Sequence, residues 1–232
     1  ISRGLVGSEM CIRDRLGTSV DWSISRFTMD EGLSLSVKKV FIELFNKGLI
    51  YQDKRLVNWD TVLETAVSDL EVNQKEIEGI LWFIKYKIYE DDEFITVATT
   101  RPETMFGDAA IAVHPQNEKL NKYIGKKANI PFSKKLIPII ADKYADPKKG
   151  SGAVKITPAH DFNDFLIGKK HNLNFINIFN KNAKLNENVP KKFFGMDRYK
   201  ARDLILKNLK KLGLLEKQTK NKMVLPLSLI HI

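Results

Sequence analysis

The first group of residues that could perform chemistry is Thr99-Thr100-Arg101-Pro102-Glu103-Thr104, which directly follows an apolar run typical of a β-strand. Proline fixes its own φ and has no N–H to donate, so the strand should end here. Two hydroxyls, a guanidinium and a carboxylate would then be displayed in a rigid turn. Such a turn could hold a ribose or a phosphate, because Arg offers forked donors and Thr small ones. The alternative is a strand-end turn held by an Arg101–Glu103 ion pair.

A second polar group lies within residues 150–164, which read GSGAVKITPAHDFND. A Gly-x-Gly turn permits close backbone approach, and side chains alternate in the strand that follows, so Lys155 and Thr157 share a face. Asp161 and Asp164 are three residues apart at a predicted helix start, which places both carboxylates on one side of the helix. His160 lies beside them. The alternative is that the two aspartates only complement the helix dipole, by a few tenths to about 1 kcal/mol each.

Metal binding is a poor alternative for these residues. His160, Asp161 and Asp164 are ligand types, yet the chain has no HExxH pattern and no Cys/His set, so we predict no metal. The Gly150–Gly152 turn is too short for a nucleotide-binding glycine loop. His114 and His171 are interpreted as surface or packing residues. Core or interface positions are predicted for the three tryptophans, Trp22, Trp59 and Trp82.

Strands must position both groups. Alternating or β-branched residues between Gly, Pro and Asp turns predict strands at 80–89, 94–99, 109–114, 137–141 and 153–157. Residues 49–72 are interpreted as short strands and turns. In the strand at 80–89, one face carries Trp82, Ile84, Tyr86 and Ile88. Several short strands of this kind favour a closed or nearly closed β structure.

Three helices are predicted around these strands. The first has capping-box spacing at Thr28 and Glu31 and ends at Gly48. The second follows Pro158, and the third spans about 198–212 before Gly213. In the first helix, apolar residues recur at helical spacing at Leu33, Val37, Val40, Phe41 and Leu44. The residues of the second that fit one amphipathic segment are Phe162, Phe165, Leu166 and Lys169. The inner face of the third is formed by Ala201, Leu204, Ile205, Leu209 and Leu212. The predicted fold class is α+β, a β core decorated by helices.

Composition is that of a globular protein, with 43% hydrophobic and 28% charged residues. No apolar run approaches the roughly 20 residues that cross a bilayer, and no secretory signal is visible, so a cytoplasmic location is the expectation. The formal charge of +10 suits a polyanion such as RNA. Compositional drift is the alternative, because Lys, Asn and Ile are abundant throughout. The single cysteine, Cys11, cannot form an internal disulfide.

The two ends share an unusual relationship. Residues 10–15 read MCIRDR and residues 227–232 read LSLIHI. One short DNA element encodes both peptides when it is read in opposite orientations, as ATG TGT ATA AGA GAC AG and as its reverse complement. We therefore interpret residues 1–15 and about 227–232 as non-native, derived from a sequencing adaptor. Finding both segments within a continuous native gene would contradict this interpretation.

Five stretches in one order resemble the valyl-tRNA synthetase family: LGTSVDWSISRFTMDEGL (16–33), RLVNWDTVLETAVSDLEV (55–72), TTRPETMFGDAAIAVHP (99–115), GSGAVKITPAHDFNDF (150–165) and NKMVLP (221–226). Leucyl enzymes usually read Arg-Pro-Asp where this chain has Arg101-Pro102-Glu103, and the isoleucyl pattern lacks the Arg. The resemblance implies a fragment of valine-tRNA ligase. It divides the chain into part of a class I Rossmann catalytic domain (16–72), a β-barrel-like editing domain (73–219) and a return toward the catalytic domain (220–232).

The resemblance also implies functional roles. The editing domain would hydrolyse threonyl-tRNA(Val), with Asp164 holding the α-ammonium of the misattached amino acid. Thr99, Thr100 and Arg101 would line the pocket for the aminoacyl group and terminal adenosine, and Lys155, Thr157 and Asp161 would complete its polar wall. Glu103 and His160 are included among the substrate-binding residues; Thr100 and Lys155 join Asp164 as catalytic candidates. Two departures affect contacts to the adenosine, since Lys149 replaces a usual aromatic residue and Ser151 a usual Thr.

The two ATP-binding motifs of class I synthetases, His-x-Gly-His and Lys-Met-Ser-Lys-Ser, do not occur in this sequence. We therefore expect no valine activation by this chain and no cofactor for the editing reaction, whereas the full-length enzyme would use ATP with Mg. The expected partners are the acceptor end of tRNA(Val) and a threonine or valine aminoacyl group, with no membrane and a monomeric state. Two other functions compete: an RNA-binding module without catalysis, and a freestanding trans-editing hydrolase.

Overall fold

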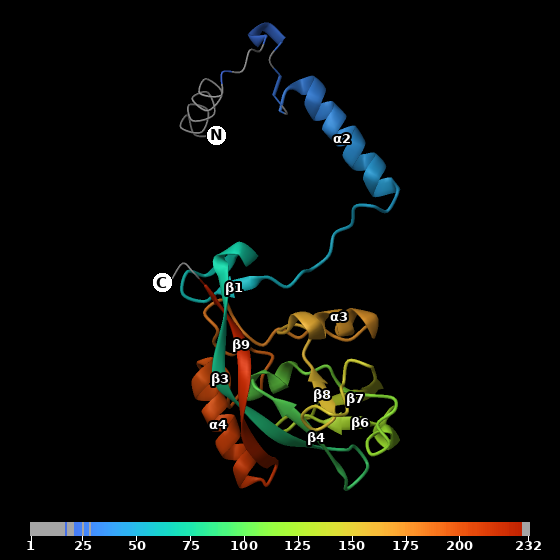
Figure 1. Cartoon of the computed structure of the whole chain (residues 1–232), viewed down its shortest axis with the longest axis vertical. Coiled ribbons are helices and arrows are strands. Elements are labelled where there is room, and N and C mark those ends of the chain that lie inside the picture. The colour runs from blue at the N-terminus through green and yellow to red at the C-terminus, as the bar shows by residue number, and fades with distance from the viewer. Residues whose placement is uncertain (1–16, 18–20, 25, 28, 229–232) are drawn as a thin grey trace. The chain divides into compact units, whose positions relative to one another are not determined.

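The computed structural model describes residues 17, 21–24, 26–27 and 29–228 (Figure 1). The chain separates into two compact units, one ending at Lys54 and the other beginning at Arg55. The segment interpreted as adaptor-derived at residues 1–15 lies outside the described residues, as do Thr28 and residues 229–232. Within the described part of the chain, no helix is both long and apolar enough to cross a membrane.

The first unit contains a short 3₁₀ helix, η1 (Trp22–Ile24), and the helix α2 (Glu31–Asn46). The helix prediction is confirmed, and Gly48 follows it with a φ of 68°. Asp30 precedes the first helical residue, and its carboxylate accepts a hydrogen bond from Phe27 N rather than from the helix itself. No residue of α2 is buried within this unit, so its apolar stripe remains exposed.

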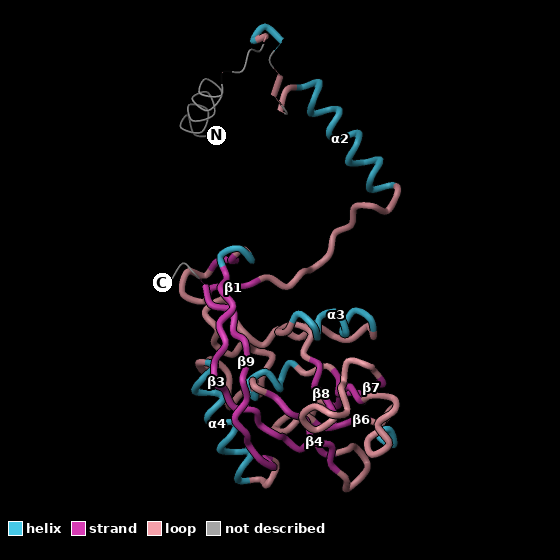
Figure 2. The backbone as a smooth tube through the Cα atoms, in the orientation of Figure 1, coloured by secondary structure: helices cyan, strands magenta, loops and turns pink. Residues whose placement is uncertain are grey.

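The second unit begins with the short strands β1 (Asn58–Asp60) and β2 (Thr65–Val67) and the 3₁₀ helix η2 (Asp69–Glu71). The central strand β3 (Val72–Lys87) then pairs antiparallel with both β4 (Phe94–Thr99) and β9 (Leu215–Ser228), as Figure 2 shows. The predicted face of β3 is confirmed, since its inward residues are all buried: Trp82, Ile84, Tyr86 and Ile88. The strand β9 was not predicted from the sequence.

A second sheet has the strand order β6-β7-β5-β8. Its strands are β5 (Ala110–Val113), β6 (Lys127–Asn129), β7 (Leu136–Ala141) and β8 (Ala153–Ile156). β5 pairs parallel with β7 and antiparallel with β8. All four residues of β5 are buried, which explains why its sequence is apolar without alternation. A short 3₁₀ helix, η4 (Asn121–Tyr123), precedes β6.

The sequence predicted a closed or nearly closed β structure, and the described sheets do not close into a barrel. The described strands form separate sheets, and the three-stranded and four-stranded sheets approach each other through an isolated bridge between Ile88 and Ala128. β4 lies beside β8, but the two strands share no ladder in the described residues. The turn at Gly150 packs against a side chain of β4, because a Cβ on Gly150 would lie 3.0 Å from the Cβ of Ala98. The observed fold is therefore mixed helix and sheet.

One hydrophobic core fills the space between the sheets and the helix α4 (Arg198–Lys211), which contributes Ala201, Ile205 and Leu209. The predicted span of α4 is confirmed to within one residue. Leu212 was predicted to face inward, but it is 61% exposed. It forms the C-cap of the helix, so it no longer follows the helical periodicity.

The helix α3 (Phe162–Lys170) also forms where predicted, but it buries a different face. Phe162 and Leu166 are more than half exposed, whereas Asp164 and Gly168 are buried. Gly168 allows close packing, because a Cβ at this position would lie 2.7 Å from two ring carbons of Pro158. The helix therefore directs the Asp164 carboxylate toward the sheet, and Ile167 packs beside the core residues of that sheet.

Two of the tryptophans can be placed. Trp82 is buried in the core, and Trp59 is 40% exposed with its indole N–H donating to Lys181 O at 2.8 Å. The side chain of Trp22 lies outside the described residues. The predicted domain boundaries at 72/73 and 219/220 remain predictions; the paired strands β3 and β9 run through both positions.

Candidate functional site

A pocket of about 200 Å³ is lined by eight of the nine site residues predicted from the sequence. It lies among the end of β4, the 3₁₀ helix η3 (Pro102–Gly107), β8 and the start of α3, which are close together in Figure 1. The predicted residues that line it are Thr99, Thr100, Arg101, Lys155, Thr157, His160, Asp161 and Asp164. Five further residues, Leu81, Ala98, Thr104, Tyr144 and Val154, complete the wall.

The two sequence groups are tied together through Arg101. The buried Thr99 hydroxyl oxygen accepts a hydrogen bond from Arg101 N at 3.1 Å, and the Thr104 hydroxyl donates to Arg101 O at 2.9 Å. The guanidinium Nη1 then donates to the carbonyl oxygen of His160 at 2.9 Å. The turn that ends β4 is thereby fixed to the loop between β8 and α3.

Lys155 lines the pocket and is the centre of a buried polar network. Its ammonium donates to the hydroxyl oxygens of Thr104 and Thr157 and, at 2.9 Å, to Asp108 Oδ1. Asp108 is completely buried and also accepts hydrogen bonds from the hydroxyls of Thr157 and Tyr86, both at 2.8 Å. Three acceptors thus satisfy the three N–H groups of Lys155, which gives the ammonium a single fixed position.

Asp108 was missed in the sequence. The available signal was a lone carboxylate in the apolar stretch MFGDAAIAV, where an unpaired charge would be costly. Burial raises the pKa of Asp108. The charge of Lys155 and the hydrogen bonds from Lys155, Thr157 and Tyr86 act in the opposite direction and lower this pKa. Burial, together with the neighbouring Asp108 charge, raises the pKa of Tyr86 well above its usual value. The phenol therefore serves as a hydrogen-bond donor to the carboxylate.

Asp164 supplies a carboxylate to the pocket wall and is only 6% exposed. Its Oδ2 accepts a hydrogen bond from Thr157 N at 2.8 Å, which joins α3 to the end of β8. Burial raises the pKa of Asp164 to about 6, although Thr157 N–H and the Lys155 charge oppose this shift. The group is therefore mostly charged at neutral pH despite its burial.

Asp161 has a different environment from Asp164. It is exposed at the N-cap of α3, and its Oδ1 accepts hydrogen bonds from Asn163 N at 2.9 Å and Asp164 N at 3.1 Å. The helix-capping alternative therefore describes Asp161. It does not describe Asp164, whose carboxylate reaches back to β8.

His160 is held as a neutral ring. Its Nε2 accepts a hydrogen bond from Ile178 N at 3.1 Å, and the ring packs edge-on against Phe179 with centroids 5.0 Å apart. Burial, with smaller contributions from Arg101 and Lys155, lowers the pKa of His160 to about 3. The ring thus fixes the loop that accepts the Arg101 hydrogen bond.

Glu103 is the one predicted site residue outside the pocket lining. Its carboxylate is 1% exposed and lies in a two-point contact with Arg202 of α4, in which both N–O distances are 2.7 Å. The Arg101–Glu103 pair considered from the sequence is present only as a longer contact of 3.7 Å. Arg202 was not identified from the sequence, since it lies 99 residues away.

Tyr144 is a second lining residue that the sequence did not reveal. It comes from the loop after β7 and is 38% exposed. Burial raises its pKa to about 12, with further contributions from the charges of Asp164 and Asp161. The phenol is therefore protonated at neutral pH and lies beside the carboxylate that faces the pocket.

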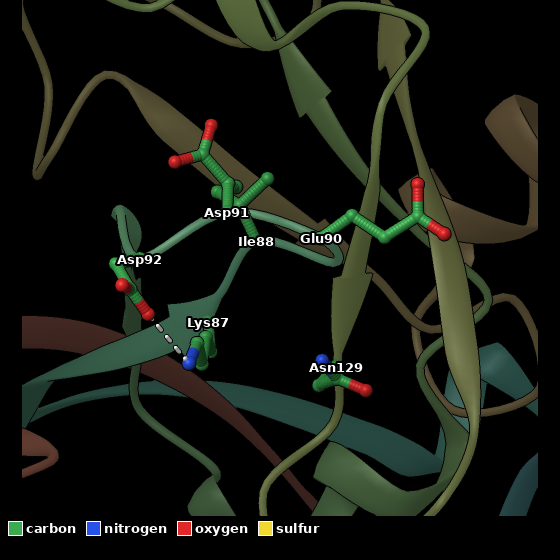
Figure 3. Close-up of a pocket in the computed structure, with 6 residues that line it drawn as sticks. All are labelled: Lys87, Ile88, Glu90, Asp91, Asp92 and Asn129. Carbon is green, nitrogen blue, oxygen red and sulfur yellow. Dashed lines mark hydrogen bonds and ion pairs between the residues drawn. The ribbon is translucent and has the colours of Figure 1, made fainter.

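A larger, more open pocket of about 380 Å³ lies at the β3–β4 hairpin (Figure 3). It is lined by Lys87, Ile88, Glu90, Asp91, Asp92 and Asn129. Two of its three carboxylates have lysine partners: Asp92 lies 3.0 Å from Lys87 and Asp91 lies 3.1 Å from Lys126. In the described part of the chain, no cluster of three or more His, Cys, Asp or Glu residues has a metal-binding arrangement.

Gly168→Ala should disturb the pocket without changing any lining residue. The added methyl would overlap Pro158 and push α3, with Asp164, away from β8. We expect a loss of about 1–3 kcal/mol in the free energy of unfolding, measured by urea denaturation. Gly32→Ala in α2 is the matched control, because its Cβ would meet no atom within 4 Å. Equal stability of the Gly168 variant and the parent would contradict the close packing.

Comparison with known proteins adds evidence independent of this geometry. The model of the family "tRNA synthetases class I (I, L, M and V)" matches residues 8–225. The chain is 55% identical to the valine--tRNA ligase of Legionella pneumophila (strain Paris) over 91% of its length, and 57% identical to that of Pelagibacter ubique over 84%. The corresponding ligase of Thermotoga maritima is 54% identical over 87%. The chain spans less than a quarter of these relatives, between 22% and 23% of their length.

Proposed function

This chain belongs to the class I tRNA synthetases (I, L, M and V), and from that premise we propose that its pocket hydrolyses wrongly charged tRNA within a valine--tRNA ligase. The observation that carries the proposal is the buried carboxylate of Asp164, which shares one pocket with Thr100, Arg101 and Lys155. An aminoacyl ester offers an α-ammonium to a carboxylate and a polarised carbonyl to hydrogen-bond donors. The pocket provides groups for both.

The reaction needs little machinery beyond this arrangement. Hydrolysis of an activated ester requires an oriented water and stabilisation of the developing oxyanion. Asp164 would bind the α-ammonium, while Thr99, Thr100 and Arg101 hold the aminoacyl group and the terminal adenosine. Lys155, Thr157 and Asp161 would form the polar wall, and His160 would support the Arg101 turn. No nucleophilic side chain or metal ion is required in this scheme.

The preferred substrate is the threonyl ester. Valine-binding synthetase sites are known to reject isosteric threonine only about 10²-fold, so a second site is needed. A site that hydrogen-bonds the threonine hydroxyl would leave buried polar groups unpaired when valine enters, at a cost of about 1–3 kcal/mol per group. The tRNA would be tRNA(Val), bound through its acceptor end. Within the longer enzyme, ATP and Mg would serve the separate charging reaction.

Deacylation of threonyl-tRNA(Val) and valyl-tRNA(Val) by the purified chain tests this function. We expect the threonyl ester to be hydrolysed at least roughly tenfold faster, which corresponds to one unpaired polar group in the valyl complex. The spontaneous rate of each ester without protein is the control. Hydrolysis of neither ester, or equal hydrolysis of both, would contradict the proposal. A pyrophosphate-exchange assay with valine should give only the background rate.

The basic charge of +10 keeps RNA binding without catalysis as a second candidate. That function predicts tRNA binding that weakens steeply with salt and is insensitive to the loss of Asp164. If the chain is a deacylase, its function should be lost when Asp164 is removed. Measuring binding and hydrolysis on the same variant therefore separates the two functions.

A further inference from the structure

We propose that Arg202 is a positioning residue of the pocket, because its contact with Glu103 keeps Arg101 available to the ligand. This inference rests on the proposed editing function, in which Arg101 contacts the aminoacyl-adenosine. Arg202 lies on α4 and is absent from the pocket lining, so it acts only through the turn that follows β4.

Arg202 is firmly held in its contact with Glu103. Its Nε lies 2.7 Å from Oε2 and its Nη2 lies 2.7 Å from Oε1, so the guanidinium engages both oxygens. The same guanidinium is stacked near the rings of Trp82 and Tyr199, at 5.7 and 5.4 Å from their centroids. A planar, two-point contact of this kind has a defined geometry that a lysine does not reproduce.

Arg101 lies close enough to compete for the same carboxylate. Its Nε is 3.7 Å from Glu103 Oε1, the oxygen that already accepts the short hydrogen bond from Arg202. The Arg101 side chain is 44% exposed, and Nη1 is bonded to His160 O. With Glu103 occupied by Arg202, the remaining surface of the Arg101 guanidinium faces the pocket.

Loss of Arg202 should therefore redirect Arg101. A carboxylate that is 1% exposed is strongly destabilised without a compensating cation. Among the cations that contact Glu103 in the described structure, Arg101 is the one that would remain. Closing the 3.7 Å contact to a direct hydrogen bond would draw the guanidinium away from the ligand and weaken its bond to the His160 loop.

The experiment measures binding of a non-hydrolysable amide analogue of threonyl-adenosine to the whole chain, together with single-turnover deacylation of threonyl-tRNA. Arg202→Met should raise the Kd of the analogue by roughly tenfold to a hundredfold, the effect expected when a charged hydrogen bond is lost. Arg101→Ala should have a similar effect, and the double variant Arg101→Ala/Arg202→Met should be no weaker than Arg101→Ala alone. A purely structural role of Arg202 predicts additive losses instead.

Removing the carboxylate provides the rescue. In Glu103→Gln/Arg202→Met no charge attracts Arg101, so most of the lost affinity should return. Lys200→Met, which removes one charge from an exposed position of the same helix, is the control for net charge. If Arg202→Met fails to fold, Arg202→Lys replaces it. A lysine leaves one Glu103 oxygen open to Arg101, so Arg202→Lys should also weaken binding. Adding Glu103→Gln to this variant should again restore binding.

Three results would overturn the proposal: parent-like affinity of Arg202→Met, additive effects with Arg101→Ala, or no recovery when Glu103 becomes Gln. An inactive parent chain would refute the editing function itself. Because the parent is measured in the same series, failure of the editing function is distinguished from failure of the Arg202 inference.

Discussion

Asp164→Ala is expected to eliminate measurable deacylation of threonyl-tRNA while leaving the chain folded. The variant removes the carboxylate proposed to bind the α-ammonium, and truncating one partner of a buried charge pair costs about 2–5 kcal/mol. The rate should therefore fall by roughly 10²-fold or more. Asp164→Asn is the matched variant, because its amide oxygen can still accept the hydrogen bond from Thr157 N.

The pH dependence of the parent provides a second signature of the same group. Burial raises the pKa of Asp164 to about 6, so the folded chain resists its ionisation. As the pH falls through about 6 the carboxylate becomes protonated, and kcat/KM for deacylation should fall with it. Burying the charge destabilises the fold above that pH. Below 3.8, the ordinary pKa of an aspartate in an unfolded chain, the group is protonated in both states and this penalty disappears.

Asp164→Asn should therefore be at least as stable as the parent at about pH 8, with an advantage that shrinks between about pH 6 and about pH 4. Thermal unfolding across this range and single-turnover deacylation on the same samples measure both effects. Retention of parent-like deacylation by Asp164→Ala would discard the assignment. The expectation fails if the parent is more stable than Asp164→Asn at about pH 8. That result would show that other contacts offset the cost of burying the Asp164 charge.

Lys155→Met is expected to produce the largest loss of stability. Asp108 is 0% exposed and Lys155 7%, and their charged groups lie 2.9 Å apart. Removing one partner of a buried ion pair costs about 3–5 kcal/mol, because the remaining charge is left without compensation. Urea unfolding should show this loss as a lower midpoint with an unchanged slope.

The double variant Lys155→Met/Asp108→Asn separates folding from function. Because it leaves no uncompensated charge, most of the lost stability should return. Deacylation should remain weak, because the Lys155 ammonium is missing from the pocket. Recovery of activity together with stability would mean that Lys155 only supports the fold. A single variant as stable as the parent would contradict the burial of this pair.

Several elements with local sequence signals were predicted correctly. Alternation of apolar and polar residues placed the inward face of β3, and helical spacing placed α2 and α4. The two polar groups around Arg101 and Lys155 were identified from residue type and spacing, and the structure places them around one pocket. These signals extend over only a few residues, so they can be read without knowledge of distant contacts.

Several of the failures involve partners that are distant in the sequence. β9 contains a polar stretch at residues 216–222 and lacks clear alternation, and its strand conformation depends on pairing with β3. The described strands do not close into a barrel, since β4 and β8 lie beside each other without sharing a ladder. Asp108 and Arg202 carry no local motif, since their significance comes from Lys155 and Glu103 across the fold.

The sequence by itself determined the residue types and spacing of the two polar groups, and it indicated the strand end and helix start that carry them. Only the tertiary structure decided that Asp161 is an exposed cap of α3, whereas the carboxylate of Asp164 is buried and accepts a hydrogen bond from Thr157 N. The reason is geometric: Gly168 packs against Pro158, and this contact fixes which side of α3 faces the sheet. Helical spacing defines neighbours on one helix, but packing against the rest of the molecule selects the face that is buried.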